Sequence, residues 1–483
     1  MEHAIGIDIG TTNTKVGLFE YPTARLVRME SFPTPQHKLP SGGSFYMTGI
    51  LEGLEAAIQT VTSEVRGSVR VISIASVGES GVFVGKFGAS SPDVHLWFDQ
   101  RGHEFIEQIW AQGLAEEYFR ITGLAPHPNH SLGHILYHQR TLRANLEKSR
   151  WLPVADHVAW RLAREKGIDE TLASRTLCLD IQGGVMSERI LAEQGIPASL
   201  FPPLVESGTT RGAIDSSLAR TLGVAPGCEV CVAGHDHMVG SVAAGLSGPG
   251  QVLNSTGTSE GVLVLGTQPD LSHEAFLAQL SNGRHVLPGL FSRYASHSSA
   301  GHTFEWFCRL AGVPASEFFA RGDDLLQRYL ARGITGREAI FVPHLRGGGP
   351  PRRDPGARAS LHGLSDATTQ DDIAMALYLG VCLELRRTYE CAGADGACDL
   401  LVIGPAARSP LWMQLKADVL GVRTLACDVP EAVATGAVAL AALKQGEKPQ
   451  VGGVAAAYDP DPARHAALDA LYHDTYLPLV SKG

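Results

Sequence analysis

Two stretches that lie half a chain apart share one pattern, and this repeat constrains the fold more than any other feature of the sequence. Residues 7–18 and 253–263 each pass from an apolar segment through a turn rich in glycine, threonine and serine into a second apolar segment. Such a pattern is typical of a β-hairpin with small hydroxylated residues at its tip. Glycine allows close approach of a ligand to the backbone, and hydroxyls and amides donate to phosphate oxygens. The pair predicts a duplicated architecture that holds phosphate at two points, with two ordinary hairpins as the alternative.

Segments of strand character alternate with amphipathic helical segments along the chain, and neither a heptad nor a solenoid period is present. This alternation predicts an α/β protein in which helices cover layered sheets. The predicted strands are residues 4–9, 15–19, 69–77, 230–233, 251–254, 261–265 and 400–403. The predicted helices include residues 49–65, 105–110, 153–164, 370–391, 410–420 and 431–443. Residues 345–355 are so rich in glycine, proline and arginine that we expect an irregular loop, either beside a ligand or as a plain surface connection.

Length and composition narrow the class of protein. The chain has 483 residues, enough for two large domains or three ordinary ones, and its 44% hydrophobic and 19% charged residues are typical of compact soluble proteins. A net charge of −10 disfavours a nucleic-acid partner. No apolar run reaches the ~20 residues that cross a bilayer, and the first residues lack a secretory-signal pattern. With only 8 cysteines, we expect a cytoplasmic protein with reduced thiols and no membrane partner.

Two carboxylates stand where predicted strands run into turns. Asp8 directly precedes the first glycine and threonine turn, where its charge would repel a phosphate unless a cation such as Mg²⁺ bridged the two. The alternative is that Asp8 only caps the turn. Asp236 lies just beyond the strand predicted at 230–233, where it could take the proton of a hydroxyl that attacks phosphorus. A metal site formed with His235 and His237 is the competing interpretation of that second cluster.

Three further features have both a functional and a structural interpretation. Asp99 and Arg101 follow two aromatic residues and could form a wall for sugar hydroxyls, or only a surface ion pair beside a core aromatic pair. The turn at residues 404–409, between a predicted strand and helix, is of the kind that admits an adenosine moiety. Cys228 and Cys231 would point to opposite faces of a strand, so buried thiols are favoured over a shared metal.

Six motifs, taken in order, resemble those of the FGGY carbohydrate kinases, which belong to the actin-like ATPase superfamily. They are residues 8–15, 97–101, 234–237, 255–259, 404–418 and 431–437. The resemblance spans roughly residues 3–445. It implies an α/β fold with two actin-like, ribonuclease H-like domains around a cleft. We expect residues 1–240 to form the N-terminal sugar and phosphate domain and residues 241–483 the C-terminal adenosine domain.

The resemblance also implies a role for each matching residue. Asp236 would be the catalytic base, and Asp8 would help to place Mg²⁺. The substrate would be faced by Glu79, Asp99, Arg101, Asp236 and His237. ATP would be held by Thr11, Thr12, Asn13, Lys15, Thr256, Gly257, Thr258, Gly404 and Ala407.

The activity that the resemblance implies is transfer of the γ-phosphate of MgATP to a hydroxyl of a small sugar or polyol, in a protein that forms a homodimer. Asp99 and Arg101 are similar to residues of xylulokinases, whereas Glu79 is similar to a glycerol-kinase residue. A ketose such as xylulose is therefore the first expectation, and glycerol, tetritols and sugar acids are alternatives. Pro405 stands where the family shows glycines, which could alter adenine binding. A nucleotide-dependent switch protein and a metal-dependent hydrolase are the rival classes.

Overall fold

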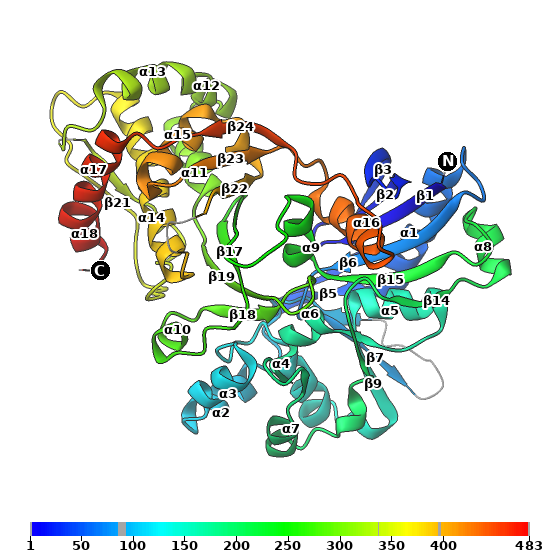
Figure 1. Ribbon diagram of the computed structural model, residues 1–483. Coiled ribbons are helices and arrows are strands. Elements are labelled where there is room, and N and C mark those ends of the chain that lie inside the picture. The colour runs from blue at the N-terminus through cyan, green and yellow to red at the C-terminus, as the bar shows by residue number, and fades with distance from the viewer. Residues whose placement is uncertain (1, 86–92, 337, 395–397, 482–483) are drawn as a thin grey trace.

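The computed structural model describes residues 2–85, 93–336, 338–394 and 398–481, and it places one large sheet in each half of the chain (Figure 1). The first sheet has the strand order β14 (Thr210–Ala213), β15 (Glu229–His235), β6 (Val69–Ser76), β1 (Glu2–Ile9), β2 (Asn13–Tyr21) and β3 (Arg25–Pro33). The second has the order β18 (Ser281–Arg284), β19 (Phe291–His297), β17 (Glu260–Gly266), β16 (Val252–Thr256), β22 (Leu400–Ile403), β23 (Thr424–Cys427) and β24 (Val454–Tyr458).

The two sheets repeat one topology. In the first, β3, β2 and β1 are antiparallel neighbours, and β6 and β15 then continue parallel to β1. In the second, β19, β17 and β16 are antiparallel, and β22 and β23 then run parallel to β16. The hairpins β1–β2 and β16–β17 therefore hold equivalent places. The predicted duplication and the predicted α/β class are both confirmed.

The strands and helices that the hydrophobic pattern predicts are present. The predicted strands match β1, β2, β6, β15, β16, β17 and β22, with small shifts at the ends. The predicted helices are α1 (Met47–Thr62), α2 (His103–Ala111), α5 (Val154–Ala163), α14 (Gln370–Cys391), α15 (Pro410–Leu420) and α16 (Ala432–Lys444). At the start of α14 the hydroxyl of Thr369 and the carboxylate of Asp372 cap each other's backbone amides, which fixes where that helix begins.

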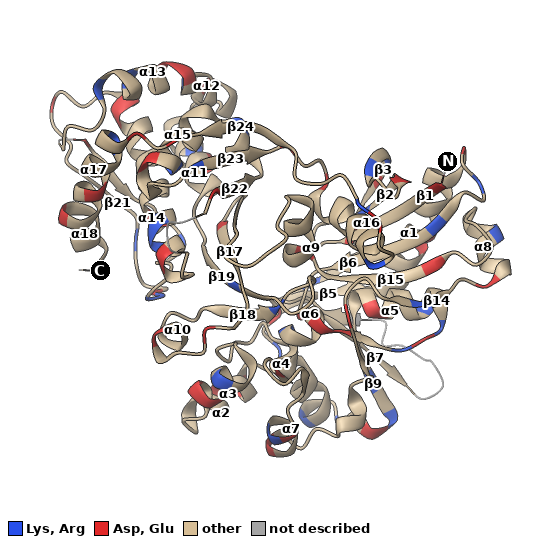
Figure 2. Ribbon diagram, in the orientation of Figure 1, with Lys and Arg blue, Asp and Glu red and all other residues tan. Residues whose placement is uncertain are grey.

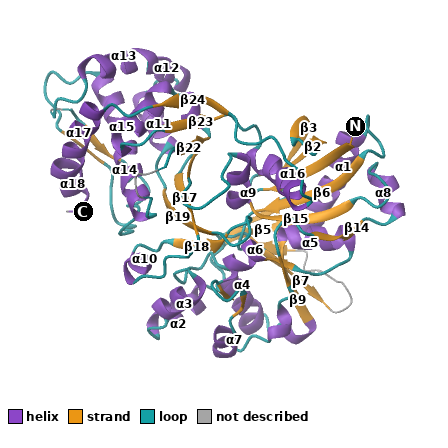
Figure 3. Ribbon diagram, in the orientation of Figure 1, coloured by secondary structure: helices purple, strands orange, loops and turns teal. Residues whose placement is uncertain are grey.

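Further α-helices and short strands are present in the part of the chain that the structure describes (Figure 3). The additional helices are α3 (Ala115–Thr122), α4 (Ser131–Leu136), α6 (Glu170–Ala173), α7 (Glu188–Gln194), α8 (Ser216–Leu222), α9 (Asp236–Ala243), α10 (His273–Leu277), α11 (Gly301–Ala311), α12 (Ala315–Ala320), α13 (Gly322–Arg332), α17 (Pro462–Leu471) and α18 (Leu477–Ser481). The small sheets pair β4 (Gln36–Leu39), β5 (Gly42–Tyr46) and β8 (Asp93–His95); β7 (Gly81–Gly85) and β9 (Ser149–Pro153); β10 (Ile168–Asp169) and β13 (Leu204–Val205); β11 (Leu179–Asp180) and β12 (Val185–Met186); and β20 (Ile340–Val342) and β21 (Ser360–His362).

Strand β1 shows how the first sheet buries both of its faces. Ile5, Ile7 and Ile9 alternate along the strand and join the apolar cluster formed with α1 and α5. The opposite face carries the small residues Ala4 and Gly6, and α16 packs on it. A Cβ atom on Gly6 would lie 2.2 Å from the carbonyl oxygen of Ala434, so only glycine permits this approach. Helix α16, from the last part of the sequence, therefore packs directly on the first strand, β1.

Helices α9 and α16 lie between the two halves in Figure 1 and pack closely against each other. A Cβ atom on Gly436 of α16 would lie 2.1 Å from the carbonyl oxygen of Val239 in α9. The two helix axes can therefore approach at backbone distance. Since α9 begins at the end of β15, this contact fixes the position of the residues at its N-terminus.

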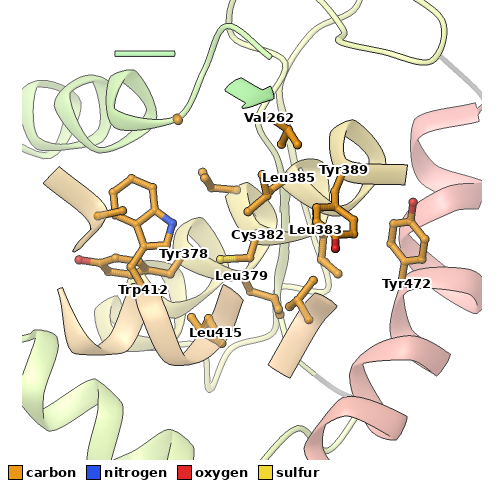
Figure 4. Close-up of a cluster of buried hydrophobic side chains, with 14 of the residues drawn as sticks. Val262, Tyr378, Leu379, Cys382, Leu383, Leu385, Tyr389, Trp412, Leu415 and Tyr472 are labelled. Atoms are coloured by element: carbon orange, nitrogen blue, oxygen red, sulfur yellow. The ribbon is translucent and has the colours of Figure 1, made fainter. Parts of the chain in front are cut away.

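Helix α14 is the centre of the core of the second half (Figure 4). Its buried side chains include Tyr378, Leu379 and Leu383, and they contact the core around Trp412 of α15 and Val262 of β17. This core connects the second hairpin, β16–β17, to the helices that pack behind it. Figure 2 shows acidic and basic residues interspersed along the ribbon of both halves.

Two features bear on expectations about cysteines and membranes. Cys228 and Cys231 are free and buried, as expected, and burial raises the pKa of their thiols to about 12 and about 11. Among the described residues, no helix combines the length and the apolar character that spanning a bilayer requires.

Buried histidines predict a loss of stability in mild acid. Burial lowers the pKa of His134 and His138 to about 4 and that of His95 to about 2, and His157 and His285 are lowered to about 3. These imidazoles are neutral in the folded chain but take up protons near pH 6.5 once unfolded. The free energy of unfolding therefore falls as the pH drops from 6.5 towards 4, by up to about 1.4 kcal/mol per pH unit for each histidine.

The opposing groups are fewer. The raised pKa values of Asp8 and Asp156, both about 7, and the raised pKa of buried Asp169 favour the folded state as the pH falls through the same window. We therefore expect the urea midpoint, followed by tryptophan fluorescence, to be lower at pH 5 than at pH 7. The variant His138→Gln should weaken this dependence, whereas the exposed His473→Asn should leave it unchanged. A midpoint that is equal or higher at pH 5 would contradict the prediction.

Candidate active site

A pocket of about 530 Å³ opens where the two halves meet. The first half contributes Thr11 from the tip of the first hairpin, Glu79 from the segment after β6, and Asp236 from the start of α9. The second half contributes Ser259 from the second hairpin and Tyr294 from β19. The pocket therefore lies at the ends of both sheets, which is where α/β folds bind ligands.

Asp236 is the first residue of α9, immediately after β15. The backbone amide of His237 donates to its Oδ1 at 2.6 Å, and the Nε2 atom of His235 lies 3.3 Å from the same oxygen. Burial keeps the pKa of His235 well below its usual value, so this imidazole is a neutral neighbour of the carboxylate. The carboxylate is held at a helix N-terminus with an oxygen open to the pocket, where it can accept a proton from a bound hydroxyl.

Asp8 lies at the end of β1, opposite Lys15 in the hairpin register. Burial, reinforced by the nearby negative charge of Asp236, raises the pKa of Asp8 to about 7. Two carboxylates whose charges act on each other in this way are a suitable environment for a divalent cation. Among the described residues, no group of three or more His, Cys, Asp or Glu side chains could enclose a metal. The two carboxylates of Asp8 and Asp236 nevertheless fit Mg²⁺, which is usually held by one or two carboxylates together with water and phosphate oxygens.

The first hairpin presents its polar tip towards the pocket. The amide of Gly10 donates to the carbonyl of Asn13 at 3.1 Å and closes the turn. The indole Nε1 of Trp97 donates to the hydroxyl of Thr11 at 3.0 Å, while Thr12 is exposed. Lys15 forms a 2.6 Å ion pair with Glu431, just before α16, so the hairpin is tied to the second half of the chain.

The second hairpin forms one unit with the turn that follows β22. The hydroxyl of Thr256 donates to the carbonyl of Ile403 at 2.8 Å, and Gly257 and Thr258 are exposed at the tip. Gly404 has φ +92°, and a Cβ atom there would lie 2.0 Å from the carbonyl oxygen of Thr256. The amide of Ala407 donates to the carbonyl of Gly404 at 3.1 Å. Glycine is thus required both by the backbone conformation and by the close contact.

The resemblance implies that the Gly404 turn holds the nucleotide, and on that expectation Gly404→Ala should weaken nucleotide binding. The methyl group must displace either the turn or the second hairpin, and a non-glycine residue in this conformation costs about 1–3 kcal/mol. We expect the dissociation constant for ADP, measured by calorimetry, to rise about 10-fold or more. Gly446→Ala is the matched control, because Gly446 has φ +81° with open space around it. Equal effects of the two substitutions would show that backbone strain alone, and not the contact with Thr256, is responsible.

Asp99 and Arg101 are not among the residues that line the pocket. Asp99 is fully buried, and its carboxylate accepts hydrogen bonds from Nε of Arg101 and from the amide of Gly43, each at 2.7 Å. Burial alone would raise the pKa of Asp99, but these hydrogen bonds lower it to about 2. Asp99 and Arg101 therefore pair with each other, in the segment that also carries Trp97. The expectation that they face the substrate therefore gains no support from their placement.

Arg175 is a pocket residue that no sequence motif indicated. It lies in the short 3₁₀ turn Ser174–Thr176 and forms a 2.7 Å ion pair with Glu79, in which both side chains are 12% exposed. It also donates to the hydroxyl of Ser281 in the second half at 2.7 Å. Glu79 has φ +60°, a backbone conformation that residues other than glycine seldom adopt. The only sequence signal was the glutamate itself.

The repeated sheets, the paired hairpins and the pocket between the halves are the architecture of the actin-like fold. Within that fold, the model of the FGGY family of carbohydrate kinases, N-terminal domain, matches residues 3–243, and the model of the C-terminal domain matches residues 252–444. The chain therefore belongs to the FGGY family of carbohydrate kinases, whose members transfer phosphate to alcohol groups and use ATP.

Individual relatives differ in the acceptor that their names print. The L-fuculokinase of Escherichia coli (strain K12) is 25% identical over 443 residues, 89% of this chain and 90% of its own length. The xylulose kinase of Bacillus subtilis (strain 168) is 28% identical over 293 residues, 60% of this chain and 57% of its own length. The glycerol kinase of Bordetella parapertussis is 29% identical over 370 residues, 73% of this chain and 70% of its own.

Solved structures show the same fold over the whole chain. The ligand-bound xylulose kinase from Lactobacillus acidophilus has a TM-score of 0.88 at 19% identity and covers 100% of this chain and 98% of its own. The gluconate kinase from the same organism has a TM-score of 0.87 at 19% identity, covering 99% and 98%. The Plasmodium falciparum glycerol kinase with ADP has a TM-score of 0.88 at 18% identity, covering 99% and 98%.

Proposed function

We propose that this protein transfers the γ-phosphate of MgATP to a hydroxyl of a small sugar or polyol, and that Asp236 is the catalytic base. The observation that carries the proposal is the position of Asp236, at a helix N-terminus and in the wall of the pocket between the halves. In the reaction, the hydroxyl oxygen bonds to the γ-phosphorus as the bond to ADP breaks. The hydroxyl proton passes to Asp236.

The nucleotide is proposed to lie across the second hairpin and the Gly404 turn. The hydroxyls and amides at the tips of both hairpins would hold the phosphates, and Ala407 would border the adenosine. Asp8 would hold Mg²⁺ through water or directly. When bound, that ion neutralises charge on the phosphates. We also propose that residues 1–240 bind the acceptor and residues 241–483 the nucleotide, with α16 of the second domain packed against the first.

A ketose such as xylulose is the first acceptor to test, because the xylulose kinases of Bacillus subtilis and Lactobacillus acidophilus are among the relatives. Glycerol, tetritols and sugar acids are the alternatives within the family. The rival from another class is an actin-like protein that hydrolyses ATP without a sugar acceptor. A carboxylate positioned in a walled pocket supports the kinase, because a switch protein has no need of an acceptor site.

The test is a coupled assay of ADP release with MgATP and a panel of pentuloses, hexuloses, alditols, glycerol and aldonates. We expect one acceptor class to raise ADP release at least about 10-fold above the rate without acceptor. Release that no member of the panel stimulates would favour the ATPase switch. The same assay with Asp236→Asn is the control for contaminating enzymes, because only turnover by this protein should be lost in the variant.

A further inference from the structure

One cation in the pocket has no acidic partner. Arg353 lines the pocket, and among the described residues its guanidinium forms no ion pair and no hydrogen bond. The other arginine of the pocket, Arg175, is neutralised by Glu79. Although Arg353 remains accessible from the cleft, the protein on its other sides lowers its pKa, as burial of a cation does. Arg353 is exposed to solvent within the pocket, so its guanidinium can exchange water for a bound anion without breaking an ion pair inside the protein.

The segment that carries Arg353 is anchored at its base. It belongs to the glycine- and proline-rich loop between β20 and β21. The amide of Gly348 donates to the carbonyl of Asp354 at 2.7 Å, forming an antiparallel bridge that closes the loop one residue after Arg353. Gly349 packs against His297, where a Cβ atom would lie 3.1 Å from the histidine Cβ. The loop therefore holds Arg353 at the pocket before any ligand binds.

Arg353 lines the same pocket as Asp236 and Tyr294. Its charge acts on His127 and Tyr294, both of which line the pocket. Burial and the charge of Arg353 lower the pKa of His127, so this imidazole adds no second cation. The charge of Asp236 reaches Tyr294 as well, so the base and the free arginine lie within electrostatic reach of the same side chain.

We infer that the acceptor is a polyhydroxy acid, whose carboxylate binds the guanidinium of Arg353 while a hydroxyl further along the chain meets Asp236. This inference rests on the proposed function and, among its acceptors, selects the sugar acids over the ketose that is the first acceptor to test. The planar guanidinium matches a carboxylate through two parallel hydrogen bonds, which a neutral ketose or alditol cannot provide. Phosphorylation of the distal hydroxyl releases ADP and leaves the carboxylate unchanged.

The experiment compares acceptors of equal carbon number: D-xylonate with xylitol and D-xylulose, and D-gluconate with sorbitol. Glucose 6-phosphate serves as an acceptor with a different anion. The variants are Arg353→Gln, Arg353→Lys and the adjacent control Arg352→Gln, which is exposed and does not line the pocket. We expect the wild type to prefer an aldonate. Arg353→Gln should lower kcat/KM for that aldonate about 10- to 100-fold.

The remaining readouts separate the explanations. Arg353→Gln should lower kcat/KM for the aldonate far more than for a neutral acceptor of equal carbon number and should leave KM for MgATP unchanged, whereas Arg352→Gln should change none of these. Calorimetry of aldonate binding should show the same loss for Arg353→Gln without turnover. If the wild type preferred a neutral acceptor and Arg353→Gln did not change kcat/KM for it, the inference would be overturned, but the proposed kinase activity would not. Preference for the sugar phosphate, or a raised KM for MgATP with every acceptor, would have the same consequence. A lack of turnover with every acceptor would overturn the proposed function itself.

Discussion

The variant Asp236→Asn is expected to lower kcat about 10²- to 10⁴-fold, the usual contribution of a positioned general base. Asparagine keeps the size of the side chain and its place at the start of α9, but it cannot accept the hydroxyl proton. The amide of His237 can still donate to its side-chain oxygen. We therefore expect the affinity for ADP and the urea midpoint to change little. The measurement is kcat with the best acceptor at saturating MgATP.

The matched control for this variant is Asp323→Asn. Asp323 is an exposed carboxylate in the first turn of α13 and lies outside the pocket. Its kcat should equal that of the wild type. If Asp236→Asn retained more than about a tenth of the wild-type kcat, or lost activity only because its urea midpoint fell, Asp236 would not be the base.

The second large effect is expected at Lys416, whose ammonium is fully buried behind the second hairpin. It donates to Oδ1 of Asn254 at 2.7 Å and pairs with the equally buried carboxylate of Glu260. Glu260 also lies 3.2 Å from Nε2 of His297. Replacement by methionine keeps the length of the chain but leaves Glu260 without its cation. Breaking a buried pair in this way destabilises a protein by about 3–5 kcal/mol.

The matched control is Lys444→Met, which removes the cation of the partly exposed pair with Glu206. Pairs of that kind contribute about 0–1 kcal/mol. Urea unfolding should therefore show a large loss for Lys416→Met and a small one for Lys444→Met. The double variant Lys416→Met with Glu260→Gln should recover part of the loss, because it removes the orphaned charge. Equal losses in the two single variants would contradict this account of the buried pair.

Local patterns predicted the repeated parts of the fold. Apolar alternation in β1 and β16 and the glycine and threonine turns beside them are properties of short segments, so sequence reasoning found both hairpins. The same holds for α14 and α15, whose predicted bounds agree with the structure. The packing of α16 on the first sheet could not be found in this way. It depends on Gly6 and Ala434, which are far apart in the chain.

The candidate site was predicted less completely, for the same reason. Motif residues such as Asp236 and Gly404 carry a signal in their own neighbourhood. The partner of Glu79 does not, because Arg175 reaches it only after the chain has folded. Asp99 and Arg101 show the converse, since a motif spacing cannot tell whether two charges face a ligand or each other. The composition of residues 345–355 predicted an irregular loop, but it could not show that this loop places Arg353 at the pocket.

The measurement that tests the central claim most directly is ³¹P NMR of the protein with MgATP and its best acceptor. Transfer to a hydroxyl predicts a new phosphomonoester resonance that grows in step with ADP, with little inorganic phosphate. Without acceptor, the ATP signals should persist. Growth of inorganic phosphate at the same rate with and without acceptor would contradict the kinase and identify the protein as an ATPase of the same fold.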